Sequence, residues 1–92
     1  MNEEFDAQLI RTADRLRVMS AAQLNQGDRV DSARKLIVAM ALRVRPEAVV
    51  PTLAASALGD QLAVVGKEFA AVAASDEAED MANQLRELRL SL

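Results

Sequence analysis

Hydrophobic residues recur every three or four positions along most of the chain, a spacing that predicts amphipathic helices. A first helix is expected over residues 3–26, with Phe5, Leu9 and Leu16 on its apolar stripe. Gly27 is expected to end this helix, because glycine readily takes the left-handed conformation found just past a helix.

A second helix is expected from Asp28, a favourable N-cap residue, to about Val44. Its apolar positions form more than one stripe, which indicates a helix buried on much of its circumference. Pro46 stops this helix. Together with Pro51 it predicts one tight turn at residues 46–50, followed by further helix.

Residues 52–74 form the next apolar stretch, and periodicity alone allows one continuous helix there. Gly59 and Gly66 argue against it, since a glycine costs about 1 kcal/mol in a helix interior. A last helix follows, because Asp76 and Glu79 have the spacing of a capping box at a helix start. No segment alternates as a strand does, so the pattern predicts an all-α fold.

One dipeptide repeats within this pattern. Gly27-Asp28 recurs as Gly59-Asp60, 32 positions later, at the same offset from an apolar stripe. A helix–turn–helix period near 34 residues is typical of tetratricopeptide repeats. With Gly59 as a turn, the chain forms two TPR-like helical hairpins, residues 5–44 and 46–74, and a C-terminal capping helix, about five helices in all. The alternative is a chance alignment of alanine-rich helices.

The composition narrows the classes of function. A length of 92 residues fits one domain, residues 1–92. The net charge of −3 disfavours nucleic acid as a partner, and a helical DNA-binding regulator has only the basic segment 29–45 in its favour. No apolar run is long enough to cross a membrane. The acidic start at Glu3 and Glu4 is unlike a signal peptide, and the absence of cysteine suits a reducing cytoplasm.

The side chains most used in catalysis are missing. The chain has no histidine, cysteine, tyrosine or tryptophan, so its serines and threonines have no histidine to activate them. The acidic cluster at residues 76–80 lacks the central glycine of a calcium loop, which favours helix capping. No enzyme activity, cofactor, metal site or small-molecule substrate is therefore expected.

Three stretches resemble a known family. The helix that ends at Asn25-Gln26-Gly27 resembles the Asn-Gln-Gly turn and preceding helix of the tetratricopeptide-like co-chaperones of type III secretion needle subunits. Residues 46–59, with two prolines and a final Leu58-Gly59, are similar to the helix that follows in that family. The segment from Ala74 onward resembles its C-terminal part, and the likeness covers about residues 13–90.

The resemblance implies a chaperone in the bacterial cytoplasm. Such a protein, with a second small helical co-chaperone, holds the needle subunit as a soluble heterotrimer before export. It cradles the amphipathic C-terminal helix of the needle subunit in a hydrophobic groove, which prevents premature polymerisation.

The expected partner-binding residues follow from this geometry. In a tetratricopeptide-like array the first helix of each hairpin lines the concave side, and counting back from the two glycine turns gives three positions in each hairpin. Phe5 and Leu9 lie outside this register and form a second contact surface or pack on the second helix. Each apolar position is equally compatible with ordinary core. The six counted positions are Arg17, Ala21, Leu24, Val49, Leu53 and Ala57.

A different class of function stays open beside the chaperone. The alanine- and glycine-rich region 55–73 suits close packing against a second copy of itself. The chain is then a homodimeric structural or adaptor protein without a role in secretion.

Overall fold

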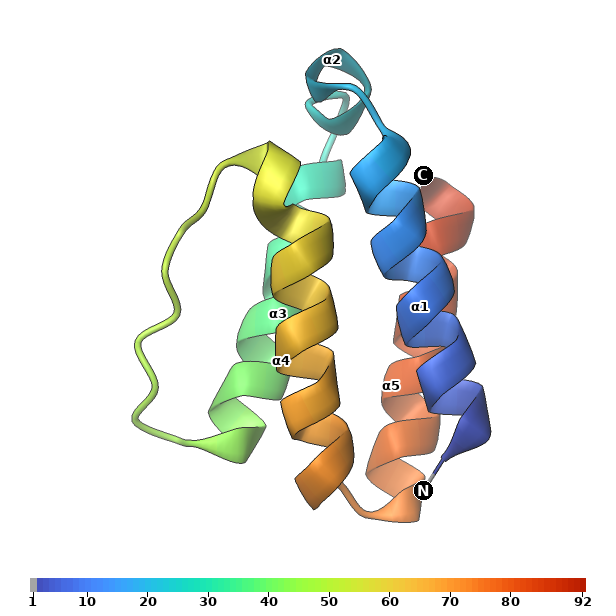
Figure 1. The fold of residues 1–92 in the computed structure, drawn as a ribbon, viewed down its shortest axis with the longest axis vertical. Coiled ribbons are helices and arrows are strands. Elements are labelled where there is room, and N and C mark those ends of the chain that lie inside the picture. Colours follow the sequence, from blue (N-terminus) through green and yellow to red (C-terminus); the bar gives the residue numbers. More distant parts are fainter. Residues whose placement is uncertain (1) are drawn as a thin grey trace.

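Four long helices pack in two layers, with α1 and α4 in the near layer and α3 and α5 behind them (Figure 1). The computed structural model describes residues 2–92, and its regular structure is all helical, which confirms the expected all-α class. Its shortest extent of 17 Å suits two helix layers, because packed helix axes lie about 8–10 Å apart. The elements are α1 (Glu3–Val18), α2 (Ala21–Leu24), α3 (Arg29–Val44), the 3-10 turn η1 (Ala55–Ala57), α4 (Leu58–Val72) and α5 (Ser75–Ser91).

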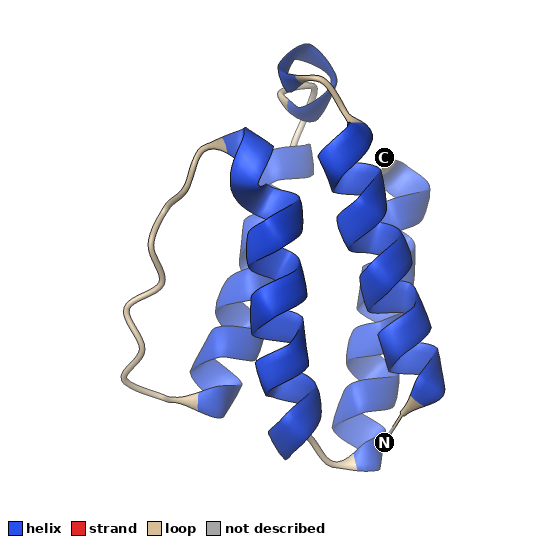
Figure 2. Ribbon diagram, in the orientation of Figure 1, coloured by secondary structure: helices blue, strands red, loops and turns tan. Residues whose placement is uncertain are grey.

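α3 and α4 are neighbours that run in the same direction, so the chain returns the full length of the bundle between them (Figure 1). Residues 45–54, here called the crossover segment, make this return as a loop on the outside (Figure 2). A helix of 16 residues, such as α3, is about 24 Å long, and ten extended residues span roughly 33 Å. An extended segment of this length is therefore sufficient.

The helix expected after a turn at residues 46–50 is absent, and that prediction is wrong. A single turn does close at the start of the crossover segment, where the Ala48 N–H donates to the Arg45 carbonyl over 3.0 Å. Beyond it the backbone stays non-helical as far as Ala54. Pro46 and Pro51 favour this, because a proline disfavours helix in the residue before it.

The two expected helical hairpins, residues 5–44 and 46–74, are not formed either. α1 packs mainly against α4 and α5, and α3 packs mainly against α4 and more lightly against α5. α1 and α3 therefore lie at diagonal corners of the bundle (Figure 1). The second hairpin has no first helix, because the crossover segment occupies its place.

The first expected helix, residues 3–26, is interrupted at Ser20. The Ser20 Oγ accepts a hydrogen bond from the Gln23 N–H over 3.2 Å, and the Ser20 N–H donates to the Gln23 side-chain oxygen over 2.9 Å. This reciprocal capping box starts the short helix α2. The turn predicted at Gly27 is confirmed, since its φ is +60°.

Gly59 lies in the first turn of α4 and not in a turn between helices. A β-carbon at this position would lie 2.7 Å from the carbonyl oxygen of Ala13. Two turns further on, a β-carbon at Gly66 would overlap the side chain of Leu9. Both glycines therefore let α4 approach α1 closely, which offsets their cost in a helix.

The last helix, α5, forms as predicted, but its cap lies two residues earlier. The Glu77 carboxylate, not that of Glu79, accepts the Ala74 N–H over 3.1 Å. The same carboxylate accepts two hydrogen bonds from Arg43 on α3, over 2.5 and 2.9 Å. Glu77 thus ties the start of α5 to the end of α3.

The core lies between the two layers, and its centre is mostly aliphatic. The rings of Phe5 and Phe69 pack with centroids 5.5 Å apart and join α1 to α4. Thr12 is fully buried, and its hydroxyl donates to the Gln8 carbonyl over 2.7 Å and lies 3.2 Å from the Leu85 carbonyl oxygen on α5. The largest fully buried apolar side chains are Phe5, Leu24, Ile37, Met40, Leu58, Leu62 and Leu85.

Candidate partner-binding site

The crossover segment is held to the bundle by contacts from three sides. Arg34 on α3 donates a hydrogen bond to the Leu53 carbonyl over 2.7 Å, and Gln61 on α4 donates to the Pro51 carbonyl over 3.0 Å. Val50 is partly buried against the core, whereas its neighbour Val49 faces solvent, since side chains alternate along an extended chain. The segment is therefore held in place over its second half, from Val50 to Leu53.

An apolar depression of about 430 Å³, here called the crossover groove, lies between this segment and α4. Its lining comes from the crossover segment, η1 and α4, with Ala41 contributed by α3. Aliphatic side chains and Pro51 dominate it. The lining residues are Ala41, Ala48, Val49, Val50, Pro51, Leu53, Ala57, Asp60, Gln61, Val64 and Val65.

Three of the expected partner-binding residues, Val49, Leu53 and Ala57, meet in this groove. Val49 is 93% exposed, and Val64 on the opposite wall is 59% exposed. Exposed apolar side chains are ordinary when scattered singly, but several around one depression mark a surface suited to a partner.

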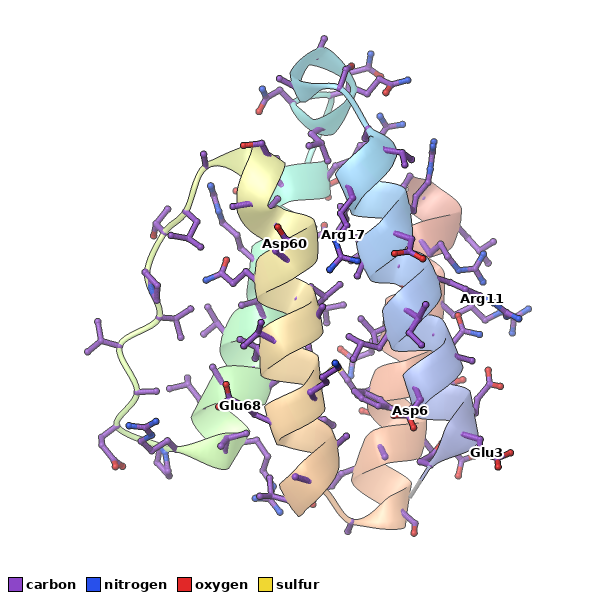
Figure 3. All side chains as sticks on the ribbon, in the orientation of Figure 1. Glu3, Asp6, Arg11, Arg17, Asp60 and Glu68 are labelled. Atoms are coloured by element: carbon purple, nitrogen blue, oxygen red, sulfur yellow. The ribbon has the colours of Figure 1, made fainter. Side chains whose placement is uncertain are left out.

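The other three counted positions, Arg17, Ala21 and Leu24, do not line the crossover groove. Leu24 is buried in the core, and Ala21 is exposed on α2. Arg17 is exposed and donates to Asp60 over 2.7 Å and to Asp14 over 2.9 Å. Figure 3 shows Arg17 and Asp60 facing one another across α1 and α4 on the near side. The hydrogen bond to Asp60 raises the pKa of the Arg17 guanidinium.

Phe5 and Leu9 line a second depression, of about 850 Å³, here called the α1/α4 groove. Both side chains are buried, so they form its floor. They pack on Phe69 and Gly66 of α4, and the expectation that they pack on the second helix is wrong. The walls include Asp6 and Ile10 on α1, with Lys67, Ala70 and Ala71 on α4.

The basic segment 29–45 is largely engaged within the chain. Arg29 donates to the Gln23 carbonyl over 2.6 Å, Arg34 donates to the crossover segment, and Arg43 pairs with Glu77. Guanidinium groups held in this way are poorly placed to contact phosphates. The arrangement disfavours the DNA-binding regulator.

Gln61 and Val64 belong to the crossover groove but were not among the residues expected from the sequence. Val64 follows Ala63 and precedes Val65, so a run of apolar residues hides which one lies on the outer side of the helix. The packing of α4 on α1 and α3 determines that Val64 is the residue of this run that lies outside.

Within residues 2–92, no group of three or more acidic side chains is placed to hold a metal ion. No helix in that range is both long enough and apolar enough to span a membrane.

Comparison with known proteins found no matching family model, no matching curated protein and no matching solved structure.

Proposed function

We propose that this chain is a non-enzymatic binding protein that holds an amphipathic helix of a partner protein along the crossover groove. The observation that supports this most is the meeting of Val49, Leu53 and Val64 around one apolar depression, with Val49 almost wholly exposed. Burying one aliphatic side chain of this size stabilises a complex by roughly 1.5 kcal/mol.

The shape of the groove suits a helix better than a flat surface. One wall is the extended crossover segment and the other is the rod of α4, so the trough between them has a direction (Figure 1). An amphipathic helix presents apolar side chains three, four and seven residues apart on one face, and such a face fills a trough. Glu68 on α4 projects toward this side (Figure 3), which favours a partner with basic residues beside its apolar stripe.

The most concrete partner is the needle subunit of a type III secretion system in the bacterial cytoplasm. Binding then covers the apolar face through which needle subunits polymerise. A second small helical co-chaperone belongs to this proposal, as the resemblance implies. The proposal keeps one tetratricopeptide-like property, the binding of a helix in a groove. It does not keep the two helical hairpins, because the chain forms a four-helix bundle instead.

Co-expression tests the proposal. The chain is produced with the needle subunit from the same genome, and soluble needle subunit is measured after gel filtration. Val49→Asp and Leu53→Asp are expected to abolish co-elution while circular dichroism stays unchanged. Val18→Asp, which alters a valine that is 75% exposed on α1, is the matched control and keeps binding.

Two results contradict the proposal. In one, the wild-type chain leaves the needle subunit insoluble. In the other, Val49→Asp binds as well as Val18→Asp does, which shows that the crossover groove is not the contact surface. Unfolding of Leu53→Asp alone marks that residue as structural, and Val49→Asp still decides the matter.

A further inference from the structure

The near face of the molecule, formed by α1 and α4, carries charges of opposite sign on the two walls of its groove. Asp6 borders the α1/α4 groove from α1, and Lys67 borders it from α4. Neither makes an ion pair with another residue of the described chain, 2–92. At the other end of the same face, Arg17 and Asp60 are already joined over 2.7 Å.

The contacts between α1 and α4 fix the height of each charge along the bundle. Gly59 lies against Ala13 and Arg17, and Gly66 lies against Leu9. Lys67 follows Gly66 by one residue, so it lies close to the level of Leu9, between Asp6 and Ile10. Val64 precedes Gly66 by two residues and lies near the level of Ile10.

We propose that a second copy of this chain docks on this face, related to the first by a two-fold axis parallel to the helices. That rotation keeps the height of every residue and lays α4 of the second copy over α1 of the first. Lys67 of each copy then faces Asp6 of the other. The exposed Ile10 likewise faces Val64 of the other copy.

The unpaired charges select both the occupant and the axis. The α1 wall carries two acidic residues without an ion pair, Glu3 and Asp6, and Asp6 lies nearer to the level of Lys67. A copy of the same chain brings the ammonium of its Lys67 to within about one helical turn of the height of Asp6, so a single docking pairs both lysines with both Asp6 carboxylates. An axis perpendicular to the helices instead places Asp6 opposite Arg17 and Lys67 opposite Asp60, and those two groups are already engaged with each other. Ala70 and Ala71, small residues on the α4 wall, let the copies approach closely.

Sedimentation velocity across a micromolar concentration series tests this pairing. The wild-type chain is expected to dimerise. Asp6→Lys and Lys67→Glu each place like charges opposite one another twice per dimer, and each is expected to weaken the dimer about tenfold. The double variant Asp6→Lys/Lys67→Glu exchanges the signs and is expected to restore it. Lys35→Glu, on an exposed residue of α3, leaves the dimer unchanged.

Several outcomes overturn the inference. One is a wild-type chain that stays monomeric up to millimolar concentration. Another is a double variant whose dimer is no stronger than those of the single variants, because with a perpendicular axis the double exchange weakens the dimer further. Ile10→Asp is expected to abolish the dimer, with circular dichroism as the check on folding. Val49→Asp is expected to leave the dimer intact, so failure here is distinct from failure of the proposed function.

Discussion

Gly59 lies against the backbone of Ala13, so close that a β-carbon on the glycine would be 2.7 Å from the alanine carbonyl oxygen. This contact sets the spacing between α1 and α4 at their upper ends (Figure 1). Gly66 repeats it two turns along α4, where it lies against Leu9. The two glycines thus allow α1 to pack closely on α4, and α3 lies at the opposite corner of the bundle.

Replacing Gly59 with alanine is therefore expected to destabilise the fold. Alanine gains about 1 kcal/mol of helix propensity over glycine. The overlap with a helix backbone costs about 1–3 kcal/mol, because the backbone of α1 cannot rotate away. A net loss of up to about 2 kcal/mol is expected in urea denaturation. A more stable Gly59→Ala variant would show that α1 and α4 do not approach as described.

Gly66→Ala provides the matched comparison, since its obstacle is the side chain of Leu9 and not a backbone. Alone it is expected to destabilise. In a Leu9→Ala background the obstacle is gone, and Gly66→Ala becomes neutral or stabilising through helix propensity. Arg17→Ala is not expected to rescue Gly59→Ala in this way, because the Ala13 carbonyl remains.

The sequence alone predicted the helical class, the ends of α3, the last helix and the turn at Gly27, because these depend on local signals. The break at Ser20 was also open to prediction, since Ser20 and Gln23 have capping-box spacing. Gly59 was not. A glycine that permits close helix packing and a glycine that makes a turn look alike in a sequence, and only the position of α1 distinguishes them.

The crossover groove shows a different limit of sequence reasoning. Val49, Leu53 and Ala57 were grouped by counting along a helix that does not form. They meet because the crossover segment folds back along α3 and α4 and ends in η1. The two prolines in that stretch disfavour a helix. That the segment must span the whole length of the bundle follows only from the parallel arrangement of α3 and α4. Val64, on the other wall, depends on the same topology.

The ion pair between Arg43 and Glu77 predicts a dependence of stability on pH. Hydrogen bonds from Arg43, and then from the Ala74 N–H, lower the pKa of Glu77 from 4.5 to about 2. A carboxyl group with a lowered pKa in the folded state contributes stability above pH 4.5 and loses it as the pH falls from 4.5 toward 2. In Glu77→Gln this contribution is absent at every pH.

Thermal unfolding of wild type and Glu77→Gln between neutral pH and pH 2 measures this effect. The two midpoints are expected to differ near neutrality and to converge as the acid limit is approached. Glu79→Gln is the control, because Glu79 is exposed on the same helix and makes no ion pair with the rest of residues 2–92. Its unfolding is expected to track wild type at every pH. A constant gap between wild type and Glu77→Gln would contradict the linkage.

Thr12 joins α1 to α5 through its hydroxyl, and removing this hydroxyl is expected to lower the free energy of unfolding. Thr12→Val keeps the shape and deletes the hydrogen bond to Gln8 together with the hydroxyl's approach to Leu85. A loss of about 1 kcal/mol in urea denaturation is expected. Thr52→Val, at an exposed position in the crossover segment, is expected to change stability by less than about 0.5 kcal/mol. Equal effects at the two positions would show that the Thr12 hydroxyl contributes nothing.

The last prediction concerns Gln61, whose side chain holds the Pro51 carbonyl. The crossover segment has few backbone hydrogen bonds of its own, so it depends on such contacts to stay against α4. Gln61→Ala is expected to raise severalfold the rate at which elastase, which cuts after small aliphatic residues, cleaves between Ala48 and Leu53. The urea midpoint stays close to that of wild type, because α4 itself is unaffected.

Gln84→Ala, which removes a bond to Asp80 within α5 only, is the control and leaves the cleavage rate unchanged. If Gln61→Ala and Gln84→Ala are cut equally fast, the outer wall of the groove is held by Val50 and Arg34 alone. The Gln61 contact then has no part in building the surface on which a partner helix lies.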